Sequence, residues 1–282
     1  MLDLLVGIFV IGLLSAILFV VSLRASLRMH ERLIHLLGIF VVAMIVAYVT
    51  RVQGHPALSQ LLPFSNLIVL SNWQPLLVSA LAGLLWHRLP AQVWRKSVVT
   101  CALVVACLLS VYRPILAQPP AMHDRWDGPV CMQTSQASCT PAAAATLLRQ
   151  HGIRTNEQEM ALLCLTSRDG TQTLGLYRGL KLKTRGTPWD VYMFSGGRIE
   201  DLRGTGPVLL SVELRPDEVT MRELQGGGWM VGVPHSVVLI GFIGTERVAI
   251  ADPSFGRQIW TLDELRLLWH GEGVRLVRTR AE

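Results

Sequence analysis

Long apolar runs occupy the first 117 residues and constrain the fold more than any other feature of the chain. Residues 3–22 carry one acidic residue at their edge, and further runs cover 33–50, 66–86 and 97–116. A helix of about 20 apolar residues spans the hydrocarbon core of a bilayer. The sequence therefore predicts an all-α region of about four transmembrane helices, and we expect membrane lipid to be its partner.

The third run is the most ambiguous, because residues 52–87 contain no Asp, Glu, Lys or Arg. That stretch is longer than one span requires. We place the span at 66–86 and expect residues 57–64 to lie along the membrane interface or in a short re-entrant turn. No basic segment precedes the first run and no small-residue cleavage site follows it, which favours an anchor over a cleaved signal peptide.

Basic residues are concentrated in the first and third connections between these runs. They are Arg24, Arg28, Arg32, Arg88, Arg95 and Lys96. Loops that carry such an excess of Lys and Arg remain in the cytoplasm. The pattern predicts a multi-pass protein of a bacterial inner membrane, with the chain after residue 117 on the periplasmic side.

A proline-containing stretch at 117–129 ends the apolar region, which gives predicted domains at 1–117 and 118–282. The net charge of +6 arises from basic residues scattered among acidic ones, with no Lys/Arg run. This distribution argues against nucleic acid as a partner. No cysteine spacing is typical of a zinc site, so we expect neither a metal nor another cofactor.

One cysteine of the soluble part lies where a helix is predicted to begin. Ser138 or Thr140 suits the N-cap, and Gly152 suits the position just after the last turn. The free N–H groups and the dipole of a helix N-terminus favour a thiolate at Cys139. Two interpretations remain open at this point: an activated nucleophile, or a small buried residue in a turn.

Helices precede strands in the soluble part. A capping box at 155–158 introduces a second helix and residues 174–183 predict a third. Short runs rich in β-branched and aromatic residues then follow at 189–194, 207–214, 235–244, 247–253, 257–261 and 274–279, with a helix at 262–269. Helices followed by antiparallel strands around one core are typical of the α+β class.

A histidine and an aspartate on two of these strands complete a candidate thiol site. His235 opens one strand and Asp252 ends the next, and Gly244 lies at the turn between them. Adjacent antiparallel strands bring two such ends to the same edge of a sheet. Because a thiolate nucleophile needs a base and the base needs an orienting group, we predict that these residues act with Cys139.

The same segments resemble the C39 peptidases, the double-glycine leader peptidases of the papain-like class. The resemblance lies in Gln133 followed by Cys139, in PHSVVLIGF at 234–242, and in VAIADPSFGRQIWTLDELRLLWHG at 248–271. It implies a papain-like cysteine peptidase domain in which helices pack on an antiparallel sheet. It also implies a peptide or protein substrate, such as an exported or leader peptide.

The resemblance assigns a role to each candidate residue. It implies Cys139 as the nucleophile, His235 as the general base and Asp252 as the residue that orients the base. It implies Gln133 as the side-chain donor of an oxyanion hole. The chain as a whole would then be a membrane-anchored cysteine peptidase with a Cys-His-Asp triad.

Three features depart from the family pattern. Thr140 stands where the family usually has Gly, the P-loop motif of transporter-fused members is absent from this sequence, and the charge bias places the domain outside the cytoplasm. Two alternatives remain: a catalytically silent C39-like peptide-binding domain, and another thiol acyl-transfer enzyme of the amidase or transglutaminase kind.

Two further cysteines, Cys131 and Cys164, lie in the soluble part. In an oxidising compartment they would form a disulfide or remain as small buried apolar residues. A rival pairing of Cys131 with Cys139 would block the proposed nucleophile.

Overall fold

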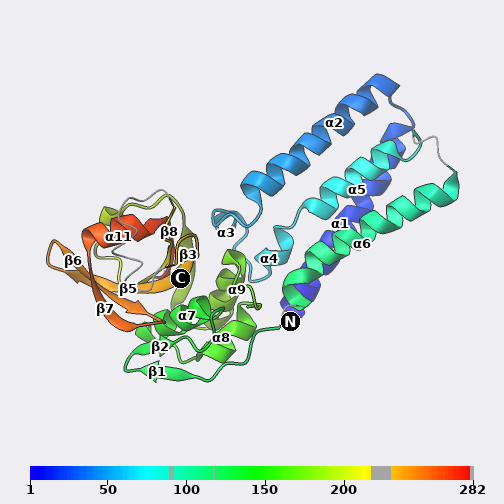
Figure 1. The fold of residues 1–282 in the computed structure, drawn as a ribbon. Coiled ribbons are helices and arrows are strands. Elements are labelled where there is room, and N and C mark those ends of the chain that lie inside the picture. The colour runs from blue at the N-terminus through cyan, green and yellow to red at the C-terminus, as the bar shows by residue number, and fades with distance from the viewer. Residues whose placement is uncertain (89–91, 117, 217–229, 280–282) are drawn as a thin grey trace. The chain divides into compact units, whose positions relative to one another are not determined.

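The chain forms two compact units in the computed structural model, which describes residues 1–88, 92–116, 118–216 and 230–279 (Figure 1). The helical unit consists of residues 1–55 and 66–116. The second unit contains the chain after the last apolar helix and, in addition, residues 56–65.

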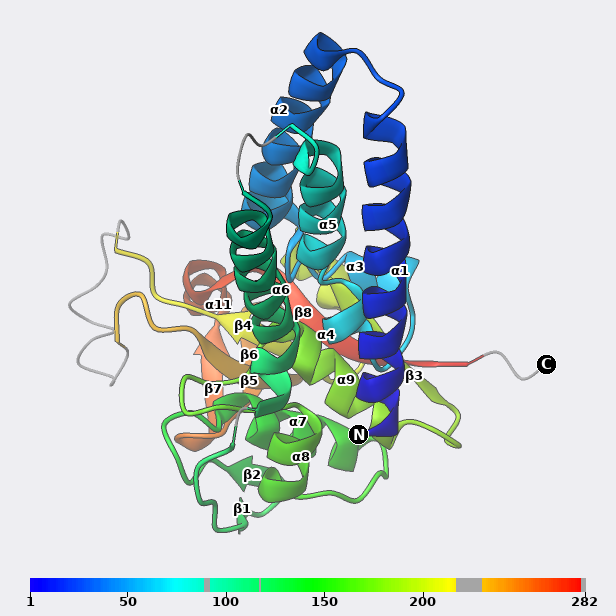
Figure 2. The ribbon, with the colours of Figure 1, turned by 90° about the vertical axis from the view of Figure 1, so that its right-hand side faces the viewer.

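The helical unit contains four segments that are long and apolar enough to cross a membrane (Figure 2). They are α1 (Leu2–Ser26), α2 (Glu31–Ala47) with its π-helical extension η1 (Tyr48–Val52), α4 (Leu67–Leu70) with α5 (Gln74–Leu85), and α6 (Val93–Leu116). The third segment is interrupted between α4 and α5, where the Tyr48 hydroxyl donates to the carbonyl of Ser71. The four expected apolar segments are therefore present, and the ambiguous third one is a broken helix.

A glycine allows two of these helices to approach closely. A Cβ atom at Gly83 of α5 would lie 2.5 Å from the Phe19 carbonyl oxygen and 2.8 Å from the Ser22 Cβ atom of α1. Small residues at such crossings bring helix backbones into direct contact, which is a common way to associate helices in lipid. The contact between α1 and α5 is thus specified by residue size.

The soluble unit begins with a hairpin and three helices. The hairpin is β1 (Arg125–Asp127) and β2 (Val130–Met132), and the helices are α7 (Cys139–Gln150), α8 (Glu157–Leu163) and α9 (Thr173–Lys183). The short helix α3 (Leu58–Leu61) also belongs to this unit. The predicted helices are all present, and α7 begins at Cys139 itself, one residue earlier than expected.

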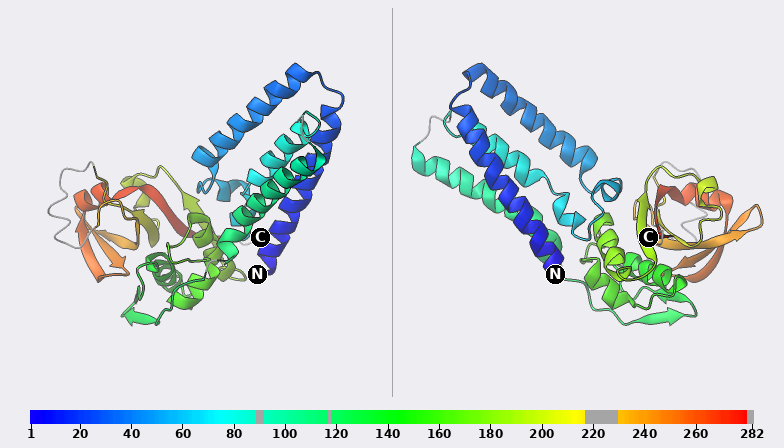
Figure 3. Two further views of the ribbon diagram at one scale, coloured as in Figure 1. Left: turned by 45° about the vertical axis from the view of Figure 1, so that its right-hand side comes forward. Right: turned by 180° about the vertical axis from the view of Figure 1, so that it is seen from behind.

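A six-stranded antiparallel sheet follows the helices (Figure 3). Its strands are β3 (Trp189–Phe194), β4 (Val208–Val212), β5 (His235–Ile243), β6 (Arg247–Asp252), β7 (Gly256–Thr261) and β8 (Trp269–Arg278), in the order β3-β8-β4-β5-β6-β7. The helix α11 (Leu262–Leu268) and the 3-10 helix η2 (Ile199–Leu202) complete the unit. The α+β class predicted from the sequence is confirmed.

The two faces of the sheet carry different partners. Val237 and Leu239 of β5 join the apolar cluster that also contains residues of α11 and η2. The helix α7 packs against β5 with an Ala-rich buried surface, Ala142–Ala145. Since alanine side chains are short, they let α7 lie close to the strand, and its first turn is held next to the beginning of β5.

We expect Gly179→Ala to lower the melting temperature of the protein. A Cβ atom at Gly179 of α9 would lie 2.3 Å from the Cys164 Sγ atom and 3.2 Å from the Met160 Cε atom. Overpacking of this kind costs about 1–3 kcal/mol, which exceeds the roughly 1 kcal/mol that Ala gains over Gly in a helix. The tryptophan fluorescence of the full chain during heating gives the melting temperature of each variant.

Cys164→Ala provides the matched control, because it removes the sulfur atom that the new methyl group would meet. The double variant should melt above Gly179→Ala. If Gly179→Ala alone melts at or above the wild-type temperature, the inference that α9 lies too close to Cys164 to admit a methyl group at residue 179 is wrong.

Candidate active site

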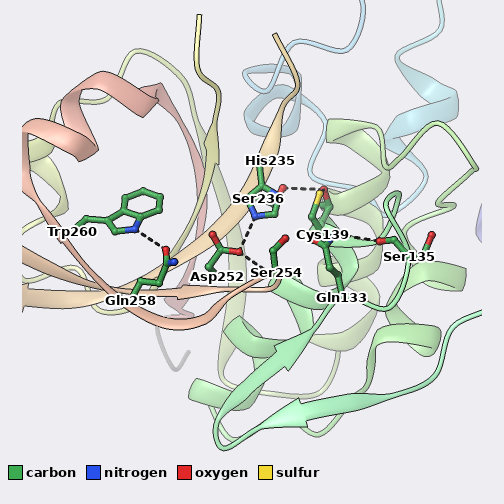
Figure 4. A network of polar contacts seen from close by, with 10 residues as sticks. Gln133, Ser135, Cys139, His235, Ser236, Asp252, Ser254, Gln258 and Trp260 are labelled. Atoms are coloured by element: carbon green, nitrogen blue, oxygen red, sulfur yellow. Dashed lines mark hydrogen bonds and ion pairs between the residues drawn. The ribbon is translucent and has the colours of Figure 1, made fainter. Parts of the chain in front are cut away.

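Cys139 is the first residue of α7 and is partly buried (Figure 4). The N-cap is Ser138, but its hydroxyl makes no bond to the helix and instead donates to the Ser135 carbonyl at 2.7 Å. The first N–H groups of a helix have no partner within it, so those of α7 are available near the thiol. The local sequence therefore places Cys139 at the positive end of a helix dipole.

His235 and Asp252 meet as the strand pairing predicted. The two strands β5 and β6 are antiparallel neighbours, and the His235 Nε2 atom lies 3.0 Å from the Asp252 Oδ1 atom (Figure 4). Asp252 is fully buried, and its Oδ1 atom also accepts a hydrogen bond from the Ser254 backbone N–H at 2.7 Å. Asp252 thus both stabilises the turn at Asp252-Pro253 and binds the His235 imidazole.

His235 also contacts Cys139 through a side-chain hydrogen bond. Because Asp252 takes the Nε2 atom, the Nδ1 atom is the one left to face the thiol. Burial by itself raises the pKa of the Cys139 thiol, but the hydrogen bond to His235 and the charge of that imidazolium reverse the effect, and the net pKa is lowered from 9.0. The three residues form a continuous chain of polar contacts.

The pKa of His235 moves in the opposite direction. Burial alone lowers it, whereas the hydrogen bonds to Asp252 and to Cys139 raise it more strongly, to about 9. An imidazolium between two acidic groups is stabilised by both of them. The contacts of His235 therefore favour the charged thiolate–imidazolium pair over the neutral thiol and imidazole.

The other two cysteines of the soluble unit have the opposite electrostatics. Cys131 and Cys164 are fully buried, and burial raises the pKa of each thiol to about 12. Both are free in the structure, as is Cys139, so neither of the two pairings considered from the sequence is present. Of these three thiols, Cys139 is the one whose pKa is lowered.

Gln133 is held between the two sides of the site. Its backbone N–H donates to the carbonyl of Pro253, the residue that follows Asp252, at 2.8 Å. Its side-chain Nε2 atom donates to the Ser135 carbonyl at 3.3 Å. A side-chain amide has two N–H donors, so one remains after the bond to Ser135. Gln133, Cys139 and His235 line the same small cavity of about 140 Å³.

A hydroxyl pair that the sequence did not predict links the cysteine helix to the histidine strand. Thr140 follows Cys139, Ser236 follows His235, and their hydroxyl oxygens are 2.9 Å apart. The Thr140 hydroxyl also interacts with the Cys139 sulfur at 3.9 Å. The residue that departs from the family pattern thus contributes a direct contact across the site.

A second unpredicted contact fixes the segment that carries Gln133. The fully buried carboxylate of Glu157 accepts hydrogen bonds from the backbone N–H and the hydroxyl of Thr134, at 2.8 and 2.7 Å. The sequence pattern placed Glu157 only in the first turn of a helix, where acidic residues are common for their effect on the dipole. Nothing in that pattern indicates that its side chain reaches residue 134.

An open cavity of about 760 Å³ adjoins the small one, and Cys139 and His235 line both. Its walls include Leu176, Met193, Phe194, Glu213, Glu272 and Pro56. Space on two sides of the thiol suits a chain that passes the reacting group. Within the residues described, no group of three or more His, Cys, Asp or Glu side chains is arranged to hold a metal ion.

Comparison with known proteins is consistent with this site. Residues 127–185 match the model of the Peptidase C39 family, a segment that contains Gln133 and Cys139 and ends before His235. No curated protein matches the chain significantly in sequence.

Solved structures with a similar chain trace include the peptidase domains of two transporter types. A double glycine motif protease from an AMS/PCAT transporter, in complex with its leader peptide, is 21% identical over 54% of this chain and 91% of that chain, with a TM-score of 0.42. The peptidase domain of Streptococcus ComA, a bi-functional ABC transporter involved in quorum sensing, is 18% identical over 52% and 96%, with a TM-score of 0.40. The segment that carries the candidate nucleophile, residues 127–185, is thus similar in sequence to the Peptidase C39 family.

Proposed function

We propose that the protein is a membrane-anchored cysteine peptidase that hydrolyses a peptide bond in an exported or leader peptide. The observation that carries the proposal is the continuous contact from Cys139 through His235 to the buried carboxylate of Asp252. The family match supports peptidase chemistry. The presence of Cys139, His235, Asp252 and Gln133 together argues against a catalytically silent domain, since binding alone does not require this set of residues.

Acylation begins with the thiolate. The Cys139 sulfur attacks the carbonyl carbon of the scissile bond, and the carbonyl oxygen takes the negative charge. The free N–H of the Gln133 amide and the backbone N–H of Cys139 are suited to hold that oxyanion, which is commonly worth about 2.7–4 kcal/mol per donor. His235 then gives its proton to the leaving amine nitrogen, the C–N bond breaks, and a thioester remains on Cys139.

Deacylation reverses the role of the histidine. His235, now neutral, takes a proton from a water molecule, and the resulting hydroxide attacks the thioester carbonyl. The carboxylic acid product leaves, and the thiolate–imidazolium pair forms again. Asp252 keeps the imidazole in one orientation throughout, because its Oδ1 atom stays bonded to Nε2.

We further propose that the peptidase unit lies on the periplasmic side of a bacterial inner membrane. The Arg88 guanidinium, at the end of the third apolar segment, donates to the carbonyl of Met29 in the first basic connection at 3.3 Å. Loops rich in Lys and Arg remain in the cytoplasm. With four crossings, the chain after α6 then emerges on the opposite side.

We expect Cys139 to react with iodoacetamide well below the usual pKa of a thiol. Thiolate formation controls alkylation, and the pKa of Cys139 is lowered from 9.0. Asp252→Asn removes the charge that stabilises the imidazolium, so the pKa of His235 should fall and the midpoint of Cys139 alkylation should rise by about one pH unit or more. Peptide mass mapping of the full chain at each pH measures the extent at Cys139.

The same mapping includes its own controls. Cys131 and Cys164 should stay unmodified up to about pH 9, since the pKa of each is about 12. Hydrolysis of a peptide should fall as the pH rises through about 9, where His235 loses the proton that the leaving amine requires. An unchanged midpoint in Asp252→Asn would mean that Asp252 does not act on the site.

Gln133→Glu should lower the rate of acylation by an activated peptide ester about 100- to 1,000-fold, because a carboxylate of the same shape cannot donate to the oxyanion. Alkylation of Cys139 by iodoacetamide forms no oxyanion and should change little. The ratio of the two rates in one preparation is the measurement. Equal loss of both rates would assign Gln133 a purely structural role.

Fusion of alkaline phosphatase to the C-terminus should give active enzyme, because that reporter folds only outside the cytoplasm. A fusion within the first basic connection, at Arg28, should be inactive. The reverse pattern would place the peptidase unit in the cytoplasm and contradict the proposed orientation.

A further inference from the structure

The segment between the second and third apolar runs belongs to the peptidase unit. Residues 56–65 form one compact unit with the chain that follows α6. Leu58, Ser59 and Ser65 of this segment are buried, with exposed fractions of 4%, 6% and 5%. A connecting loop that only turned in solvent would not bury these side chains.

Two hydrogen bonds fasten the segment to the peptidase fold. The Gln60 amide donates to the Met193 carbonyl at 3.3 Å, and the Arg185 guanidinium donates to the Ser65 hydroxyl at 3.1 Å. Met193 lies on β3, which is one of the two edge strands of the sheet. Edge strands expose unpaired carbonyls to which an extended peptide can add, and Gln60 occupies one of them.

The beginning of the segment reaches the candidate active site. Pro56 is buried and lines the same cavity of about 760 Å³ as Cys139 and His235. The Ser59 hydroxyl donates to the Pro56 carbonyl at 2.7 Å, and the Ser59 N–H donates to the same oxygen at 3.0 Å. These bonds fix the position of Pro56 just before α3, so its ring forms a rigid part of the cavity wall.

We infer that residues 56–65 are a component of the substrate-binding cleft, with Pro56 as a wall that contacts an extended peptide and Gln60 as the residue that holds the wall in place. This inference rests on the proposed peptidase function. The polypeptide between two apolar helices thereby completes the site of a unit whose other residues begin only at 117. Pro56 contacts the bound peptide, whereas Gln60 positions the segment through its hydrogen bond to the Met193 carbonyl.

Pro56→Trp in the full-length protein tests the wall directly. A randomised pool of tetrapeptide vinyl sulfones is the probe: the Cys139 thiolate adds to the vinyl carbon and the neighbouring carbon takes a proton. The larger indole ring should fill the cleft and slow labelling at least tenfold, while iodoacetamide, which needs little space, should react at the wild-type rate. Leu162→Trp is the matched control, since Leu162 of α8 is exposed and lines neither cavity at Cys139, so this change should leave both rates unchanged.

Gln60→Glu tests the tether, because a carboxylate cannot donate to the Met193 carbonyl. We expect the concentration for half-maximal labelling by the peptide probe to rise about threefold to tenfold, the effect of losing one hydrogen bond, with the maximal rate maintained. Gln53→Glu is the control: Gln53 accepts a hydrogen bond from the Gln74 amide, and a carboxylate keeps that acceptor.

The outcomes separate the two proposals. If wild-type Cys139 reacts with iodoacetamide and not with the peptide pool, the proposed peptidase function fails and the inference fails with it. If the wild type reacts with both and Pro56→Trp reacts as fast as Leu162→Trp, the peptidase function stands and the inference about residues 56–65 is wrong.

Discussion

The buried carboxylate of Asp252 is the constraint on which the rest of the site depends. It has no exposed surface, and among the residues described its Oδ2 atom has no hydrogen-bond partner. A buried negative charge is costly unless a positive charge compensates it, and His235 is the group that does so. The imidazolium in turn lowers the pKa of the Cys139 thiol, so the buried carboxylate favours the charged form of both groups. Since the pKa of His235 is raised to about 9, the pair contributes to stability at neutral pH and loses that contribution as the pH rises through about 9.

Short elements hold these charges in register. The hairpin of β5 and β6 brings His235 to Asp252, and the turn after β6 is fixed by the hydrogen bond from the Ser254 N–H to the Asp252 carboxylate. The hydroxyls of Thr140 and Ser236 connect the helix start to the strand start. Each of these contacts involves a residue that lies within two positions of Cys139, His235 or Asp252 in the sequence. A small shift of α7 against the sheet would therefore change the distance between the thiol and the imidazole.

The sequence predicted those parts of the site that depend on local rules. Alternating apolar strands and one short turn were sufficient to pair His235 with Asp252, and helix-start residues were sufficient to place Cys139 at the beginning of α7. Gln133 needed the family resemblance, because no local rule joins residue 133 to residue 253. The contacts of Glu157 with Thr134 and of Gln60 with Met193 were not predicted at all. Both contacts join segments that are far apart in the chain. The sequence context of Glu157 indicates only the first turn of a helix, and that of Gln60 indicates a loop at the membrane interface.

If the apolar segments cross a membrane, the membership of residues 56–65 in the peptidase unit constrains how they do so. These residues and the chain after α6 must lie on one side, because they share one compact fold. The polypeptide between them contains the broken helix α4–α5 and the helix α6, each in a segment long enough to span. Two crossings return the chain to the side from which it left, whereas one or three would not. The third apolar run, ambiguous in sequence, is therefore required as a complete span if α6 is one.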